Sequence, residues 1–337
     1  KCGLIAMHDF KQLFQQFKNL KIGVVGDVML DTYMWGHVER ISPEAPVPIV
    51  TLDQRELRIG GAGNVALNIQ SLGAQAFVLS VTGDDEDAKR LKTLFGEQSV
   101  NADYLLSSQD RITTNKTRII SRNQQMMRLD AEITSDLNKR DEERLVELFE
   151  HFISKEKPQL VILEDYNKGV LTPAVIQCVI SICKKEGVLT AVDPKRKNFF
   201  DYKGVDIFKP NLKEVKEALN MLFTDADETL LQNIHLELNH LLHHNISFIT
   251  LSEKGVFYND AKSSSIIPSH LRNIADVSGA GDTVIAVAAL VYAATHDVKL
   301  MAEVANIAGG LVCEEVGTAA VNAQKLLQEC EHLLADS

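Results

Sequence analysis

Residues 276–283, DVSGAGDT, lead directly into the apolar run 284–290, VIAVAAL. The apolar run predicts a buried helix. The glycines just before it let backbone N–H groups converge at the helix start, where the helix dipole adds partial positive charge. Such a terminus suits a phosphoryl group whose charge has to be stabilised during transfer. Asp282 lies in the same turn and can accept a proton from an attacking hydroxyl. The alternative is an ordinary helix cap, in which Asp282 only satisfies helix amides.

The rest of the chain alternates short apolar strands with amphipathic helices. The expected strands are residues 21–26, 77–81, 159–163, 187–192, 206–208 and 246–251. The expected helices between them are residues 140–156, 172–186, 211–220 and 226–244. Such alternation predicts the α/β class, with a mainly parallel central sheet covered by helices on both faces.

Two segments interrupt this alternation. Residues 31–58 are rich in proline and aromatic residues, and residues 115–130 alternate like a β-hairpin. Neither has a helical period, so we expect both to leave the sheet as a small β lid. No repeat, low-complexity tract or flexible linker separates parts of the chain. We therefore expect residues 1–337 to form a single domain with a discontinuous lid.

Composition narrows the classes of partner. The chain has 337 residues, of which 45% are hydrophobic and 24% charged, and its net charge is −11. This charge argues against broad binding to nucleic acid or to anionic membranes. No run of 18 apolar residues is present, so we expect no membrane span. Five cysteines without a CxxC pair fit a reducing, cytoplasmic location.

A second glycine-rich stretch, residues 58–66, RIGGAGNVA, precedes a helical pattern. It does not match the G-x-G-x-x-G dinucleotide fingerprint, and the chain contains no Walker A sequence. Its glycines either permit a tight strand-to-helix turn or let the backbone approach a polyhydroxy ligand. In the second case Asn64 reaches the ligand's hydroxyls.

Polar residues follow several of the predicted strands. They occur in residues 163–169, LEDYNKG, 193–195, DPK, 209–214, KPNLKE, and 251–255, LSEKG. Asn211 and Glu214 have the spacing of a helix capping box, which is compatible with a role near Mg²⁺. Because open α/β sheets bind ligands at the carboxyl ends of their strands, we expect these residues to share one binding edge.

The order of these motifs resembles that of the ribokinase-like (PfkB-type) carbohydrate kinases. Residues 26–31, GDVMLD, 40–48, RISPEAPVP, and 121–125, SRNQQ, resemble one branch. That branch phosphorylates D-glycero-β-D-manno-heptose 7-phosphate in lipopolysaccharide core biosynthesis. The resemblance covers roughly residues 20 to 325 and implies transfer from Mg·ATP to the anomeric hydroxyl, giving a 1,7-bisphosphate.

The resemblance also implies roles for individual residues. It places the catalytic base at Asp282 and an anion hole at Gly279, Ala280 and Gly281. Sugar contacts carry over to Asp27, Asp31, Gly60, Gly61 and Asn64. Nucleotide contacts carry over to Asn211 and Glu214, and Glu214 would hold Mg²⁺, directly or through water. We also assign the nucleotide site Lys195, Ser252, Lys254, Gly255 and Asn306.

The sequence departs from the family pattern at three positions. Ser278 stands where threonine is expected, Gly63 where alanine is usual, and Glu164 where serine is usual. None of these removes a group that the mechanism needs. Many members of the branch also carry a nucleotidyltransferase domain with an H-x-G-H motif, which is not found in these 337 residues. Two other functions stay open: a related kinase for another sugar or nucleoside, and a non-catalytic sensor on the same fold.

A phosphorylated sugar needs fixed cations, and arginine binds phosphate through two parallel hydrogen bonds. The candidates are Arg122, Arg128, Lys168 and Lys195, with Arg122 first. Apolar side chains in the lid would also need cover, so we expect a homodimer in which two lids pack together.

Overall fold

The computed structural model describes residues 9–122, 124–270 and 272–334, which form a nine-stranded and a four-stranded sheet with helices around them. The large sheet has the order β13-β12-β11-β10-β9-β8-β1-β4-β5. Its strands are parallel from β5 through β11, and only β12 and β13 run antiparallel. The strands are β1 (Lys21–Gly26), β4 (Gln75–Gly83), β5 (Asn101–Ser108), β8 (Leu160–Glu164), β9 (Leu189–Asp193), β10 (Ile207–Phe208), β11 (Ile246–Thr250), β12 (Val256–Asn259) and β13 (Ser264–Ile267).

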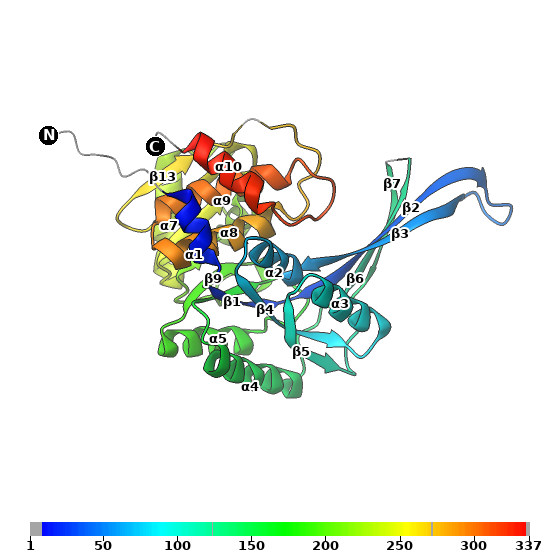
Figure 1. Cartoon of the computed structure of the whole chain (residues 1–337), viewed down its shortest axis with the longest axis horizontal. Helices are drawn as coiled ribbons and strands as arrows, with labels where there is room; N and C mark the ends of the chain where they lie inside the picture. Colours follow the sequence, from blue (N-terminus) through cyan, green and yellow to red (C-terminus); the bar gives the residue numbers. More distant parts are fainter. Residues whose placement is uncertain (1–8, 123, 271, 335–337) are drawn as a thin grey trace.

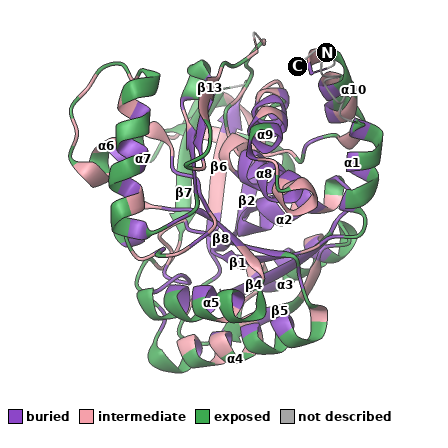
Figure 2. Ribbon diagram, turned by 90° about the vertical axis from the view of Figure 1, so that its left-hand side faces the viewer, coloured by how far each residue is buried: buried purple, intermediate pink, exposed green. Residues whose placement is uncertain are grey.

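Helices cover both faces of the large sheet, as the sequence predicts. One hydrophobic core joins the sheet to α1 (Phe10–Phe17), α2 (Ala62–Ser71), α3 (Glu86–Glu97), α8 (Ala280–Thr295), α9 (Val298–Val312) and α10 (Ala323–Leu333). A second core joins the other face to α4 (Lys139–Glu156), α5 (Pro173–Glu186), α6 (Leu212–Leu219) and α7 (Glu228–Leu242). Figure 2 shows α8 and the central strands buried, while the outer faces of α4 and α5 are exposed. The α/β class with a mainly parallel sheet is therefore confirmed.

Local sequence sets the ends of these helices. The side chain of Thr172 caps α5 by accepting a hydrogen bond from the N–H of Val175, and Pro173 occupies the first turn. The helix ends at Gly187, whose φ of 69° is the left-handed conformation that glycine adopts at low cost. Capping residues of this kind place the strand that follows each helix at a defined point along the sheet.

The four-stranded sheet has the order β3-β2-β6-β7. Its strands are β2 (Val28–Ile41), β3 (Pro48–Gly61), β6 (Asn115–Ser121) and β7 (Gln124–Ala131). β2 pairs antiparallel with β3 and parallel with β6, and β6 pairs antiparallel with β7. Figure 1 shows this sheet projecting from the body, with β2 and β3 reaching furthest. The prediction of a second, small β structure is confirmed.

In the ranges that the structure describes, no helix is both long enough and apolar enough to cross a membrane.

Candidate active site

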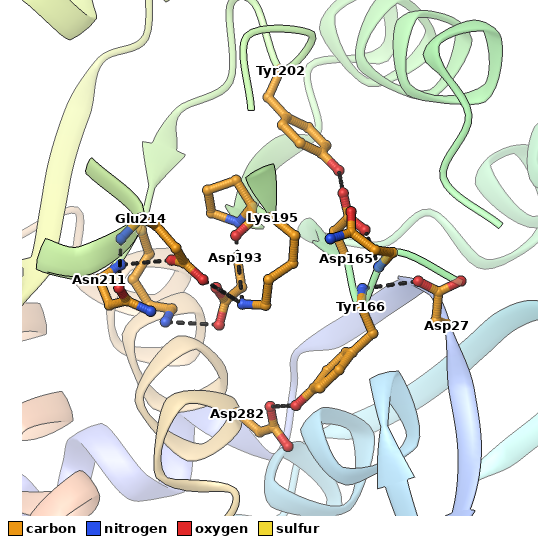
Figure 3. A network of polar contacts seen from close by, with 12 residues as sticks. Asp27, Asp165, Tyr166, Asp193, Lys195, Tyr202, Asn211, Glu214 and Asp282 are labelled. Carbon is orange, nitrogen blue, oxygen red and sulfur yellow. Dashed lines mark hydrogen bonds and ion pairs between the residues drawn. The ribbon is translucent and has the colours of Figure 1, made fainter. Parts of the chain in front are cut away.

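The candidate site lies where the carboxyl ends of β1, β8, β9 and β10 meet the start of α8. Glu164 ends β8, Asp193 ends β9, and the two pair in register. Figure 3 shows Asp193, Lys195, Asn211 and Glu214 in one cluster and the Tyr166 side chain pointing to Asp282, while Asp165 points to Tyr202. Most of the polar segments predicted to share a binding edge therefore meet there.

Asp282 is buried in the first turn of α8 and hydrogen-bonds to two other parts of the chain. Asn64 Nδ2 donates to Asp282 Oδ2 over 2.7 Å, and the Tyr166 hydroxyl donates to Asp282 Oδ1 over 2.7 Å. Burial raises the pKa of Asp282 to about 6, although these two hydrogen bonds oppose the rise. Both carboxylate oxygens of Asp282 have partners outside the helix, so this side chain does not act only as a helix cap.

The turn before Asp282 has the geometry that its glycines permit. Gly279 has a φ of 76°, and a Cβ there would come 2.8 Å from Asn64 Nδ2. Gly281 faces Asp193 and Lys209, whose nearest atoms would lie 3.6 and 3.8 Å from a Cβ. The Ala280 N–H donates to the Val277 carbonyl over 3.3 Å. The other first amides of a helix have no partner within the helix, so this turn offers N–H donors beside a cation.

Two lysines and two carboxylates form a cluster next to this turn. Lys209 Nζ lies 2.8 Å from Asp193 Oδ2, while Lys195 Nζ lies 3.3 Å from Asp193 Oδ1 and 2.9 Å from Glu214 Oε1. Burial alone would raise the pKa of Asp193, but Lys195 and Lys209 outweigh it and lower that pKa. The two lysines therefore favour the charged form of Asp193 beside the turn formed by Gly279–Gly281.

Asn211 and Glu214 form the predicted capping box at the start of α6. Glu214 Oε2 accepts from the Asn211 N–H over 2.8 Å, and Asn211 Oδ1 accepts from the Glu214 N–H over 2.8 Å. No cluster of three metal-binding side chains occurs within the described ranges. The single carboxylate of Glu214 fits Mg²⁺, which commonly binds through one or two carboxylates while keeping waters and substrate phosphates.

The predicted sugar-binding glycines lie against two aspartates, Gly60 against the Asp31 carboxylate and Gly61 against the Asp27 main chain. A Cβ at Gly60 would collide with Asp31 Oδ2, and one at Gly61, whose φ is 60°, would collide with the Asp27 carbonyl. Asp31 Oδ1 accepts a hydrogen bond from Arg118 Nη1 over 2.6 Å. Asn64 Oδ1 is buried and has no hydrogen-bond partner in the described part of the chain. This end of the site thus contains an unpaired amide oxygen and a carboxylate, which are the acceptor groups that a hydroxylated ligand needs.

Asp27 organises the loop after β8. Its Oδ2 accepts from the N–H groups of Tyr166 and Lys168 over 2.8 and 3.0 Å, and its Oδ1 accepts from the Val170 N–H over 3.1 Å. Burial, followed by the charge of Asp165, raises the pKa of Asp27 to about 6. This carboxylate fixes the loop that presents the Tyr166 hydroxyl to Asp282, and its direct contact with a sugar stays a prediction.

Lys116 is a candidate that the sequence interpretation missed. It lies on β6 opposite Asp31, and its Nζ is 5.9 Å from the centre of the Tyr166 ring. Within the described ranges no carboxylate lies at ion-pair distance from Lys116, whereas Lys168 pairs with Glu132 over 2.8 Å. Burial, followed by the charge of Lys168, lowers the pKa of Lys116. A half-buried lysine in this situation is a ready partner for an anion.

The two predicted arginines lie further along the small sheet. Arg122 follows Ser121, which pairs with Gly36, five register positions beyond the pairing of Lys116 with Asp31. At 3.3 Å per residue this offset is roughly 16 Å along the strand. Arg128 is partly exposed and pairs with Asp130 over 2.9 Å.

The remaining predicted nucleotide residues lie around the loops after β11 and β13. Ser252 and Lys254 belong to a short 3₁₀ turn (Ser252–Lys254), and Lys254 pairs with Asp225. Gly255 has a φ of 98° and packs against the Ile267 carbonyl. Asn306 Nδ2 donates to the Pro268 carbonyl over 2.9 Å and so braces the segment that leads to α8.

Glu164 is buried at the centre of the site, and neither of its carboxylate oxygens has a hydrogen-bond partner among the described residues. Burial, followed by the charges of Asp193 and Asp282, raises the pKa of Glu164 well above its ordinary value. The raised pKa favours the neutral form of this carboxyl group beside the lysine–carboxylate cluster.

A parallel α/β sheet, a glycine-rich helix start and a buried carboxylate beside it are features that fit a phosphotransferase. Residues 19–325 match the model of the pfkB family of carbohydrate kinases, and the chain belongs to that family. It is therefore a sugar kinase.

The chain is also similar to curated bacterial proteins named Bifunctional protein HldE. It is 38% identical to the Geotalea uraniireducens protein over 98% of this chain and 66% of the relative. It is 37% identical to the Coxiella burnetii protein over 95% of this chain and 65% of the relative. The chain thus spans slightly less than two thirds of the length of these two relatives.

Solved structures agree with the fold. Phosphofructokinase-2 from Escherichia coli in complex with potassium matches with a TM-score of 0.79 and 18% identity, over 94% of this chain and 99% of that one. Arabidopsis thaliana ribokinase complexed with ribose and ATP matches with a TM-score of 0.71 and 18% identity, over 92% and 99%. At these identities the likeness concerns the fold alone.

Proposed function

We propose that this kinase transfers the γ-phosphate of ATP to the anomeric hydroxyl of D-glycero-β-D-manno-heptose 7-phosphate, giving the 1,7-bisphosphate. The observation that carries the proposal is the position of Asp282 between Asn64, which has an unpaired oxygen, and the turn Gly279–Gly281, here called the phosphoryl-binding turn. The similarity to HldE proteins supports heptose as the acceptor.

In this mechanism the anomeric hydroxyl takes the place of the Tyr166 hydroxyl next to Asp282 Oδ1. Asp282 accepts the proton as the sugar oxygen attacks the γ-phosphorus. A new O–P bond forms, the bond to the β-phosphate oxygen breaks, and ADP leaves. The amides of Gly279–Asp282, the start of α8 and nearby Lys209 stabilise the charge of the phosphoryl group in flight.

Mg²⁺ would supply charge neutralisation on the nucleotide phosphates, held by Glu214 directly or through water. Asn211 and Lys195 fix the orientation of that carboxylate, since each occupies one of its oxygens. The nucleotide itself would lie over α6 and the loops around Ser252–Lys254 and Pro268.

The cations on the acceptor side would bind the phosphate of the sugar. Lys116 is the first choice, with Lys168 beside it, because one tyrosine side chain spans the gap between Lys116 and Asp282. Arg122 and Arg128 stay predictions as further contacts, and the small sheet would close over the sugar as a lid. An intact base and anion-binding turn weigh against a sensor, which needs neither.

The proposal is tested by measuring ADP release with a panel of acceptors: heptose 7-phosphate, unphosphorylated heptose, fructose 6-phosphate, ribose and a nucleoside. We expect the highest kcat/KM with heptose 7-phosphate.

Lys116→Met should raise KM for the phosphorylated sugar while KM for ATP stays nearly unchanged. Arg122→Ala measures the contribution of the more distant cation. Lys139→Met, an exposed lysine at the start of α4, is the control. Equal KM values for phosphorylated and unphosphorylated heptose in the wild type would refute the assignment.

A further inference from the structure

Arg58 links the small sheet to a loop on the body. It lies on β3, two residues before Gly60, and its side chain is 25% exposed. Its Nη1 donates to the carbonyls of Val316 and Thr318 over 3.0 and 3.3 Å. These carbonyls belong to the loop between α9 and α10, so one guanidinium group joins two elements that are about 260 residues apart in the chain.

The same loop is tied to the turn that starts α8. The Gly317 N–H donates to Asp276 Oδ2 over 2.9 Å, and Asp276 Oδ1 accepts from both the N–H and the hydroxyl of Ser278. Ser278 directly precedes Gly279, the first residue of the phosphoryl-binding turn. A side chain at Gly317, whose φ is 76°, would collide with Arg58, so the loop and the guanidinium group are in close contact.

On its other side Arg58 contacts an aromatic pair of the small sheet. Its guanidinium carbon lies 4.8 Å from the centre of the Tyr33 ring, and Tyr33 stacks with Trp35 at 6.2 Å. Arg118 also packs on Tyr33, at 5.1 Å, and pairs with Asp31. Arg58 therefore stands between the acceptor side of the site and the phosphoryl-binding turn.

We propose that Arg58 is a positioning residue that couples the arrangement of the small sheet to that of the phosphoryl-binding turn. Nucleotide phosphates bound at Gly279–Gly281 contact the segment 276–279 in one arrangement only, and so stabilise that arrangement. The hydrogen bond between Asp276 and Gly317 then fixes the loop between α9 and α10. Arg58, which contacts both this loop and Tyr33, fixes the position of the small sheet. The acceptor side is then fully arranged only when the phosphoryl donor is present. This coupling does not depend on which sugar is the acceptor.

The chain provides its own probe, because Trp35 is its single tryptophan. Trp35 fluorescence is followed while adenosine 5′-(β,γ-imido)triphosphate with Mg²⁺ is added, and calorimetry measures binding on the same samples. We expect the wild type and Arg55→Ala to show a fluorescence change that saturates with binding. Arg55 is the matched control, since it is an exposed arginine on the same strand. Arg58→Ala should bind nucleotide with little loss of affinity but lose most of the fluorescence change.

A second measurement needs no ligand. Hydrogen exchange of the backbone amides in residues 313–322 should be faster in Arg58→Ala than in the wild type, and unchanged in Arg55→Ala. Arg58→Lys separates positioning from folding, because a lysine keeps the charge but cannot bond two carbonyls while stacking on a ring. It should resemble Arg58→Ala in both measurements while unfolding at the wild-type temperature.

Each of the two measurements has its own outcome that would contradict the proposal. If Arg58→Ala keeps the full fluorescence change, or if the wild type binds nucleotide with no change at Trp35, the coupling is contradicted. If exchange in residues 313–322 is the same in Arg58→Ala as in the wild type, the structural link itself is contradicted. If calorimetry detects no nucleotide binding to the wild type, the proposed ATP-dependent reaction fails, and the exchange measurement still decides the role of Arg58.

Discussion

Asp282 depends on two residues from distant parts of the chain for its environment. Asn64 comes from the first turn of α2 and Tyr166 from the loop after β8. The first glycine pattern predicted Asp282, and the second glycine-rich stretch proposed Asn64, but nothing in the sequence linked Tyr166 to Asp282. Its contact arises from the loop held by Asp27, which only the folded chain shows.

The pH dependence of kcat/KM tests this environment, because kcat/KM reports the free enzyme, in which Tyr166 bonds Asp282. With a pKa of about 6, Asp282 becomes protonated as the pH falls, so kcat/KM should decline by about tenfold per pH unit below that value. The hydrogen bond from Tyr166 lowers the pKa of Asp282, so Tyr166→Phe should move the acid limb to higher pH. Tyr292→Phe, near the far end of the same helix, should leave the profile unchanged. An acid limb that stays in place in Tyr166→Phe would contradict the role of this hydroxyl.

Glu164 offers a test through stability. Because its pKa is raised in the folded protein, the folded state binds more protons than the unfolded chain, and stability is lost as the pH rises above about 4.5. Glu164→Gln removes this titration. The variant should therefore unfold at a higher denaturant concentration than the wild type at pH 8, with the gap narrowing toward pH 5. Glu147→Gln, an exposed carboxylate on α4, is the control. If Glu164→Gln is less stable than the wild type at pH 8, the folded protein stabilises the charged carboxylate, which contradicts the assignment.

At the scale of elements, the alternation of apolar strands and amphipathic helices predicted most of the large sheet. The antiparallel edge formed by β12 and β13 was missed, because these strands have only four residues each and follow a turn rather than a helix. The small sheet was predicted as two β segments from the lack of a helical period. Its order, with β2 beside β6, could not be predicted. Asp31 on β2 pairs with Lys116 on β6, which is 85 residues further along the chain, and pairing over such a separation depends on packing.

The contact between α7 and β11 predicts an acid-sensitive element. The side-chain oxygen of Ser247 lies 2.9 Å from His235 Nδ1 and 2.7 Å from His244 Nε2. Burial lowers the pKa of His244 to about 3, so the folded state binds fewer protons than the unfolded chain below pH 6.5. Stability should fall as the pH drops from 6.5 toward 3, by about 2 kcal/mol at pH 5 from this residue.

Urea unfolding of the wild type and His244→Gln between pH 7 and pH 5 measures this effect. The variant should lose less stability than the wild type over this interval, whatever its stability at pH 7. His240→Gln, an exposed histidine on α7, should follow the wild type. Parallel pH curves for the wild type and His244→Gln would contradict the assignment.

At the scale of the whole molecule, the small sheet leaves apolar side chains exposed to solvent. Leu52, Met127 and Leu129 are each more than half exposed. We predict that two copies pack through these sheets, so that light scattering at micromolar concentration gives twice the chain mass of 37.4 kDa. Replacing Met127 and Leu129 with glutamate should give monomers, while Leu236→Glu, an exposed apolar position on α7, should not. A wild-type particle of 37.4 kDa would contradict the prediction.

The account as a whole depends on Asp282 being the base, and Asp282→Asn tests it most directly. Asparagine keeps the shape of the side chain and can still bond Asn64 and Tyr166, but it cannot accept the proton. With both substrates saturating, kcat should fall by about 10²- to 10⁴-fold. Nucleotide binding and the unfolding temperature should change little. A kcat within about threefold of the wild type would contradict the account, because a group that only caps or braces α8 is replaced well by asparagine.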